Sequence, residues 1–156
     1  MAGRNYVEKS SKEWFEIWVA HQPKSWARKK IVFRDISEKP TFWLADCGSI
    51  VNGDCYWMEF SDDLNEDYIW LSLGVANSEF ITQYYDWKFN NKLYAGRRRF
   101  MSQYVEQFPL PNINDEISKK IIETTKKAYY DNENQISQYL SVINQLVRDV
   151  FNQKKN

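Results

Sequence analysis

The order of apolar and polar residues along the chain predicts that its first half consists mainly of short strands. Residues 11–20 (SKEWFEIWVA) place large apolar side chains at helical spacings, with Ser11 as a possible N-cap, and Pro23 would end this helix. Runs rich in β-branched and aromatic residues then indicate strands at 31–36, 41–45 and 55–60. The Asn52-Gly53 pair, between the last two runs, is a strong short turn signal. Together these runs predict a small antiparallel or mixed sheet.

The middle of the chain changes to a helical spacing of apolar residues. An acidic loop at 61–67 leads into 67–73, where a helix is favoured over a strand because Tyr68, Leu71 and Val75 share one helical face. A second helix is predicted next, followed by a turn and a short helix that two prolines end. These elements are expected at 79–87 (N-cap Asn77 or Ser78, Trp87 on the apolar side), 90–96 and 101–107 (before Pro109 and Pro111).

Two long helices are predicted in the last third of the chain. Asn114 or Asp115 can cap a helix that runs to about residue 130, and 131–134 is either a break or a continuation. From 136 to 150 the apolar residues recur at steps of three and four, which is typical of a seam that packs on another helix. Two interpretations carry equal weight at this point. The seam covers the chain's own core, or it packs on another chain or domain.

The predicted elements define an α/β (α+β) fold with a small mixed or antiparallel sheet, packed helices and long C-terminal helices. We expect an α/β domain over residues 1–112. The helical segment 113–156 would pack on that domain or on a partner.

Length and composition exclude several classes of protein. A chain of 156 residues with 17% aromatic residues suits one folded domain, with or without a helical appendage. No apolar run is long enough to span a membrane, and the N-terminus has no apolar segment typical of a signal peptide. Cys47 and Cys55 are too few for a disulfide scaffold, and they could face each other across a hairpin as small core residues. We therefore expect a reduced, cytoplasmic protein.

The formal net charge is zero, but the charges are sorted along the chain. Residues 24–39 carry six basic and two acidic side chains, and residues 88–99 carry five basic side chains and no acidic one. Between these two basic segments, 40–87 contains no Lys or Arg and nine acidic residues. Each basic segment alone would usually be a solvated face, but two of them brought together by folding would form a surface for a polyanion.

The sequence lacks the common signatures of catalysis and metal binding. It contains neither a phosphate-binding GxxxxGK[ST] loop nor a GxGxxG fingerprint, and its single histidine, His21, excludes a His-rich metal site. The carboxylates at 62, 63, 66 and 67 lack the spacing of a calcium loop and are expected to form a solvated loop. No catalytic residue and no metal ligand is therefore predicted, although a small enzyme that uses His21 with a carboxylate stays a third, weaker hypothesis.

Basic and amide side chains are the best candidates for chemistry. Arginine forks match phosphates and guanine edges, and Asn or Gln can pair with adenine. Three consecutive arginines cannot all point the same way, so one of Arg97, Arg98 and Arg99 is expected to pair with an acid such as Asp86. The residues predicted to bind a nucleic acid are Lys30, Arg34, Asn52, Lys92, Arg97, Arg98, Arg99, Gln103 and Tyr104. Trp43, Trp57 and Trp70 are interpreted as core residues.

An ordered series of short motifs over residues 22–130 resembles a known family. The motifs are 30–36 (KIVFRDI), 41–43 (TFW), 52–57 (NGDCYW), 77–78 (NS), 97–104 (RRRFMSQY) and 108–111 (FPLP). Their order is similar to that of the C-terminal target-recognition domain of TaqI-like and type IIG adenine-specific DNA methyltransferases. The Pro-Leu-Pro entry into a helix also resembles a segment of type I specificity subunits.

The resemblance implies a division of labour between two domains. In this family a separate domain binds S-adenosylmethionine and methylates adenine N6 with an Asn/Asp-Pro-Pro-Tyr/Phe motif, which this sequence lacks. The chain is therefore expected to be a C-terminal fragment that binds no cofactor itself. Its expected partners are duplex DNA and the catalytic domain, which would flip the target adenine out of the helix. The alternative function is a protein-interaction module that self-associates through the 136–150 seam.

Overall fold

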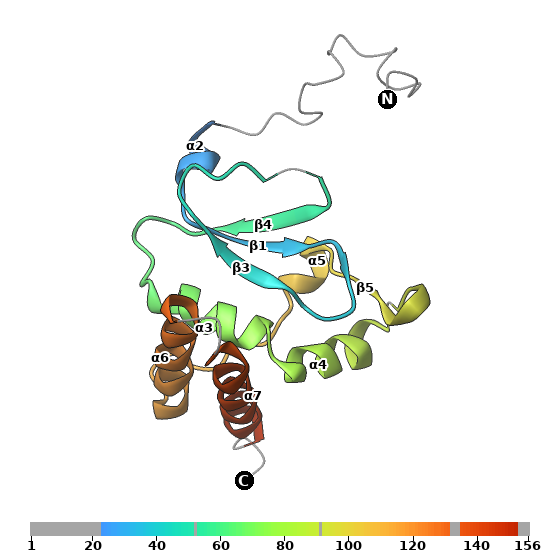
Figure 1. The fold of residues 1–156 in the computed structure, drawn as a ribbon, viewed down its shortest axis with the longest axis vertical. Coiled ribbons are helices and arrows are strands. Elements are labelled where there is room, and N and C mark those ends of the chain that lie inside the picture. Colours follow the sequence, from blue (N-terminus) through green and yellow to red (C-terminus); the bar gives the residue numbers. More distant parts are fainter. Residues whose placement is uncertain (1–22, 52, 91, 132–134, 153–156) are drawn as a thin grey trace.

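The computed structural model describes residues 23–51, 53–90, 92–131 and 135–152 of the chain. Figure 1 shows a small sheet next to α2, with the helices α3, α4, α6 and α7 below it. The elements are α2 (Pro23–Ala27), β1 (Lys30–Arg34), β2 (Ile36–Ser37), β3 (Phe42–Ala45), β4 (Cys55–Glu59), α3 (Asp67–Ala76), α4 (Glu79–Phe89), η1 (Tyr94–Gly96), β5 (Arg98–Arg99), α5 (Ser102–Val105), α6 (Glu116–Tyr130) and α7 (Ile136–Asn152). The predicted α/β fold class is confirmed. The helix predicted at 11–20 lies outside the described residues.

The main sheet is antiparallel, and β1 is its central strand. β1 pairs with β3 on one side, Val32 opposite Trp43, and with β4 on the other, Val32 opposite Trp57. Ile31, Val32 and Phe33 are each at most 2% exposed, as predicted for the strand core. A strand that is buried this completely must satisfy its backbone N–H and C=O groups away from water, and neighbouring strands on both edges of β1 do so.

The hairpin expected around the Asn52-Gly53 turn was a wrong prediction. β3 and β4 flank β1 on opposite edges and run parallel to each other, so the loop between them returns from the Lys30 end of β1 to its Arg34 end and joins strands that do not pair. Gly53 has a positive φ of 80°, the left-handed backbone that its turn signal indicates, but Asn52 lies outside the described residues. Cys47 is exposed and Cys55 half-buried, so Cys47 is not the core residue that we expected.

The two faces of the sheet cover different clusters. Ile31 and Phe33 point into the main core between the sheet and the helices. Val32 points the opposite way, into a smaller cluster with Val51 and Trp26 of α2. This alternation follows from the two-residue period of a strand, and it gives the molecule a layer of helices below the sheet and a thin cover above it.

Helix α3 is enclosed by the rest of the molecule. It is buried around most of its circumference, as expected of a helix without a strong polar face. Gly74 lies where α3 crosses α6, and a Cβ atom at this position would be 2.4 Å from Oγ1 of Thr125 and 3.0 Å from Cγ2 of Ile121. The absence of a side chain at residue 74 therefore allows the two helices to pack closely.

Asn77 links the edge of the sheet to the helical layer through side-chain hydrogen bonds. Its side chain accepts a hydrogen bond from Phe42 N (2.9 Å) and donates to Phe42 O (2.9 Å) and Leu73 O (3.0 Å). The amide thus satisfies both backbone groups of Phe42 on the outer edge of β3. The next residue, Ser78, is the N-cap of α4, and its side chain accepts a hydrogen bond from Ile81 N (3.3 Å). Asn77 therefore ends α3 and Ser78 begins α4.

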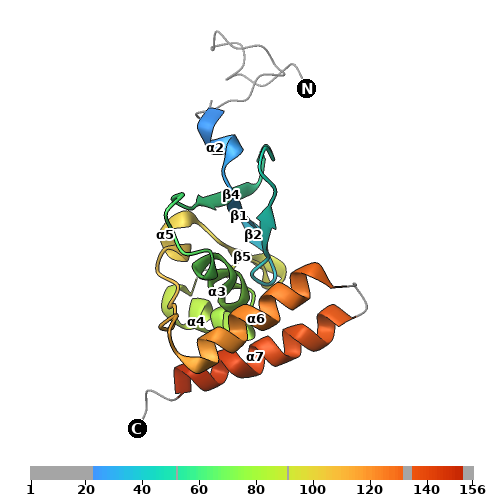
Figure 2. The same ribbon diagram turned by 90° about the vertical axis from the view of Figure 1, so that its left-hand side faces the viewer.

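The two C-terminal helices lie side by side against the remainder of the chain (Figure 2). Asp131 has extended backbone angles and ends α6, so of the two alternatives for 131–134 the helix stops at this residue. In α7, the seam residues Ile143, Val147 and Val150 are buried in the main core. These three residues therefore cover the chain's own core, whereas Ile136, Leu140 and Val142 of the same helix stay exposed.

We predict that Gly74→Ala destabilises the protein although alanine is the better helix former. The gain in helix propensity is about 1 kcal/mol, and overpacking a tight contact costs about 1–3 kcal/mol. The midpoint of urea unfolding should fall, and adding Thr125→Ala should recover part of the loss by removing the nearest atom. Ser72→Ala, in the same helix, serves as the control. Unchanged stability of Gly74→Ala would contradict the close crossing.

Candidate nucleic-acid interface

The pairing of β2 with β5 brings together the two basic segments of the sequence. Ser37 lies opposite Arg98 and Ile36 opposite Arg99 in this short antiparallel ladder, and Lys92 forms a bridge with Arg98 next to it. Phe100 N continues the link by donating to Asp35 O (2.6 Å). Segments 24–39 and 88–99, separated by the acidic stretch, therefore meet at one place in the fold.

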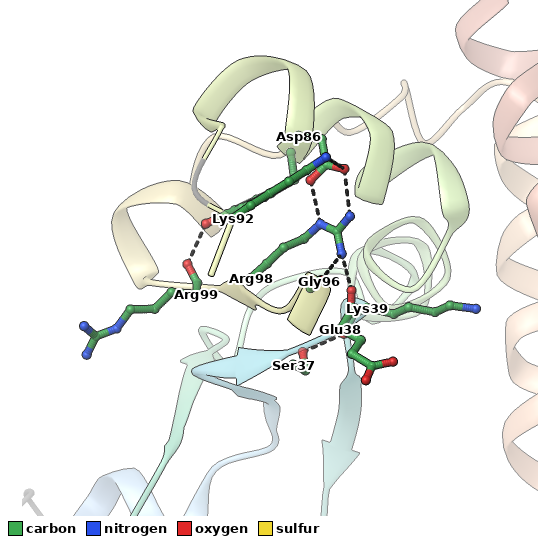
Figure 3. Close-up of polar contacts among 9 residues, drawn as sticks. Ser37, Glu38, Lys39, Asp86, Lys92, Gly96, Arg98 and Arg99 are labelled. Carbon is green, nitrogen blue, oxygen red and sulfur yellow. Dashed lines mark hydrogen bonds and ion pairs between the residues drawn. The ribbon is translucent and has the colours of Figure 1, made fainter. Parts of the chain in front are cut away.

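Asp86 is the acidic centre of this region, and Arg98 is its main partner. The guanidinium of Arg98 forms two parallel hydrogen bonds with the carboxylate, 2.6 Å from Nε and 2.7 Å from NH2, as Figure 3 shows. Its NH1 group donates to the carbonyls of Gly96 (3.1 Å) and Glu38. Lys92 also contacts the carboxylate, at 3.2 Å. One of the three arginines thus pairs with Asp86, as the sequence suggested.

This environment shifts the ionisation of both partners. The Arg98 guanidinium beside Asp86 holds the pKa of that carboxyl below its ordinary value of 3.8, although partial burial opposes the shift. The hydrogen bonds that Arg98 donates to Asp86 raise the pKa of Arg98 in turn. Both groups are therefore charged at neutral pH, and the pair links α4 to β5.

The neighbours of Arg98 point elsewhere. Arg99 pairs with Asp35 (Nε to Oδ1, 3.1 Å) and stays half exposed. Arg97 is exposed and lies over the ring of Tyr94, with Cζ 5.7 Å from its centroid. Within the described part of the chain, neither Arg97 nor the exposed Arg34 forms an ion pair. These two arginines are the cations best placed to bind an external anion.

Lys30 occupies a position that is incompatible with the predicted phosphate contact. It is fully buried, and its ammonium donates to the carbonyls of Trp26 (2.9 Å) and Ser49 (3.1 Å). A buried lysine satisfied by two carbonyls holds α2 and the 46–51 loop against the sheet and presents no charge at the surface.

The remaining predicted residues take different places. Gln103 is exposed on α5. Tyr104 is half-buried, and its ring packs against Phe89 (centroids 4.7 Å apart) and Tyr85 (6.0 Å), so it supports the core more than the surface. Lys92 is half exposed although it contacts Asp86. The structure thus brings together four of the predicted residues around β5: Lys92, Arg97, Arg98 and Arg99. Arg34 is the last residue of β1 and precedes β2 by two positions in the sequence. Lys30 is buried and lies apart from them.

Two aromatic side chains that the sequence reasoning missed are the most exposed large apolar residues of the described chain. Trp87 in α4 is 82% exposed and Tyr94 in η1 is 79% exposed. Trp87 was predicted on the apolar side of α4, and this was wrong because the buried residues Ile81 and Tyr85 face the core, and Trp87 lies about 200° around the helix from Tyr85. Of the tryptophans interpreted as core, Trp70 is buried, Trp57 is half-buried, and Trp43 is 38% exposed.

The described residues offer no evident place for a metal ion. No group of three or more His, Cys, Asp or Glu side chains gathers in the described part of the chain. In the acidic loop, Glu66 pairs with Lys29 (2.6 Å) and Asp67 with Lys126 (2.7 Å), so both carboxylates take part in ion pairs within the chain. Among the described helices, none is long and apolar enough to cross a membrane.

The order of elements and the basic region at β2 and β5 define an α/β domain with a candidate anion-binding edge. Residues 2–110 match the family model of the TaqI-like C-terminal specificity domain, and the chain belongs to this family. The resemblance found in the sequence is therefore confirmed. The match ends before α6 and α7 begin.

Two relatives are type II methyltransferases. The chain is 41% identical over 134 residues to the type II methyltransferase M.BanIII of Aneurinibacillus aneurinilyticus, a match that covers 86% of this chain and 23% of that protein. It is 29% identical over 136 residues to the type II methyltransferase M.MjaIV of Methanocaldococcus jannaschii, covering 83% of this chain and 43% of that protein. The chain thus spans less than half the length of either relative.

We predict that Arg98→Gln lowers the free energy of unfolding by about 2 kcal/mol at pH 7, because hydrogen bonds to charged groups contribute about 1.5–3 kcal/mol. The folded-state pKa of Asp86 is lowered, so this contribution is present above the ordinary pKa of 3.8 and is lost as the pH falls through the lowered value. The difference from the wild type should therefore shrink in acid. Arg99→Gln, which breaks a more exposed pair, should cost less, and equal losses would contradict the assignment.

Proposed function

We propose that this chain is the target-recognition part of an adenine-specific restriction–modification methyltransferase and that it binds duplex DNA sequence-specifically. The family match over residues 2–110 carries this proposal, because specificity is the role after which that domain family is described. The names of both relatives agree with a methyltransferase context. The basic region at β2 and β5 supports it further, since phosphate neutralisation supplies much of the affinity for DNA.

Methylation would belong to a separate domain of the parent protein. The sequence has no Asn/Asp-Pro-Pro-Tyr/Phe motif, and the family resemblance assigns both this motif and S-adenosylmethionine to the catalytic domain. The role of this chain would then be to hold the duplex in register while that domain extracts the target adenine. The catalytic domain and duplex DNA are accordingly its proposed partners.

The structure supports a division of the predicted DNA-binding residues into two groups. Arg34 and Arg97 are exposed and free of ion pairs within the described residues, so they are the proposed phosphate contacts, with Lys92 beside them. Arg98 is 13% exposed in its side chain and bound to Asp86, so its proposed role is to shape the surface. Gln103 is exposed and keeps its proposed role in reading base edges.

A salt series of duplex DNA binding tests this proposal. For the full 156-residue chain, Arg97→Ala should weaken binding and reduce the slope of log K against log salt by about 1, as expected for one lost phosphate contact. Lys120→Ala, which removes an exposed cation from the distant helix α6, is the matched control and should leave the slope unchanged. Absence of binding at low salt, or equal effects of the two variants, would refute the proposal.

Self-association through α7 is the second candidate function, and the exposed part of the seam favours it. Leu140 of the seam is 40% exposed and the nearby Val142 is 48% exposed, and both line a cleft of about 1050 Å³ between α7, the start of α4 and residues 39–42. Sedimentation velocity at increasing concentration tests this idea. A dimer that Leu140→Asp abolishes and Tyr130→Asp preserves would support it, and a monomer at all concentrations would exclude it.

A further inference from the structure

The strongest unexplained feature of the molecule is the pair of exposed aromatic side chains near the basic region. We name Trp87, Lys88, Lys92, Tyr94 and Arg97 the aromatic tip. Its two aromatic members lie in the last turn of α4 and at the start of η1. In Figure 1, α4 begins beside α7, and its other end and η1 lie on the side away from α6 and α7. Leaving a Trp and a Tyr about four-fifths exposed forgoes the stabilisation that their burial would provide.

The backbone around Tyr94 is held in a defined and unusual shape. Ala95 has φ 56° and ψ 33°, a left-handed conformation that is disfavoured for any residue with a side chain, and Gly96 follows with φ 70°. Leu93 N donates to Arg97 O (2.8 Å), which closes the turn, and the Lys92–Arg98 bridge anchors its base. Tyr94 is therefore presented to solvent by a hydrogen-bonded turn.

The charge around these rings favours a nucleic acid over a protein as the partner. From residue 86 to 99 there are five Lys and Arg residues and one carboxylate, Asp86, which Arg98 and Lys92 already neutralise. Arg97 lies over Tyr94 and is exposed, so one compact unit offers both a flat ring and a cation. Proteins that bind unstacked bases combine these two features.

We propose that the aromatic tip stacks Trp87 and Tyr94 on bases that are displaced from the duplex, while Arg97 and Lys92 bind the adjoining phosphates. This inference rests on the proposed function and adds the class of ligand, which is DNA with unstacked or unpaired bases. Unstacking costs least where bases are already unpaired. The tip should therefore favour a distorted duplex over a regular one.

The test compares two probes that differ only in pairing, a fully paired DNA duplex and the same duplex with a central mismatch. The full chain should bind the mismatched duplex at least about fivefold more tightly, a factor that corresponds to the lower range of base–aromatic stacking. Trp87→Ala and Tyr94→Ala should each reduce this preference, and the double variant should abolish it. Tyr94→Phe keeps the ring and should retain the preference.

Tyr130→Ala is the matched control, because Tyr130 is 75% exposed but lies at the end of α6. It should bind both probes like the wild type. If the wild type binds the paired duplex but shows no preference for the mismatched one, or if Trp87→Ala and Tyr94→Ala both keep the full wild-type preference, the stacking inference fails and the proposed function stands. If the wild type binds neither probe at low salt, both proposals fail.

Discussion

The ion pair between Asp86 and Arg98 is the interaction on which the shape of the candidate interface depends. One guanidinium joins the carboxylate on α4, the carbonyl of Gly96 before β5 and the carbonyl of Glu38 after β2. Three segments separated by up to 60 residues are fixed by a planar, five-donor group, which lysine could not replace because its ammonium lacks the fork. Removing that group would leave Asp86 with Lys92 alone and would loosen the ladder that brings both basic segments together.

The same region explains how a chain of zero net charge can present a basic surface. Of the acids near β2 and β5, Asp35 and Asp86 are each engaged by an arginine, whereas Glu38 is exposed and forms no ion pair within the described residues. Many acids of the middle stretch lie elsewhere, and Glu66 and Asp67 pair with lysines of other segments. Arg34, Lys39 and Arg97 are exposed and form no ion pair within the described residues, so they contribute most directly to a positive local field.

The core and the candidate interface use different parts of the molecule. Gly74, Asn77 and the buried face of α7 hold the sheet, α3 and the C-terminal helices together. The aromatic tip extends from the outer end of α4, and its exposed rings are absent from that core. Changes at the tip should therefore affect ligands more than stability, whereas changes at Gly74 should do the opposite.

The sequence alone determined most of the element list, the buried strand at 31–33 and the family, because these depend on local apolar spacing and on ordered motifs. Tertiary structure decided the rest. The Asn52-Gly53 turn signal could not reveal that β1 would lie between β3 and β4, since a local turn signal does not specify which strands pair. Lys30 and Arg97 are both basic residues in predicted binding segments. However, Lys30 is buried and donates to two carbonyls, whereas Arg97 is exposed. Whether a cation or an aromatic ring meets solvent is set by contacts between distant segments, and local spacing does not encode those contacts.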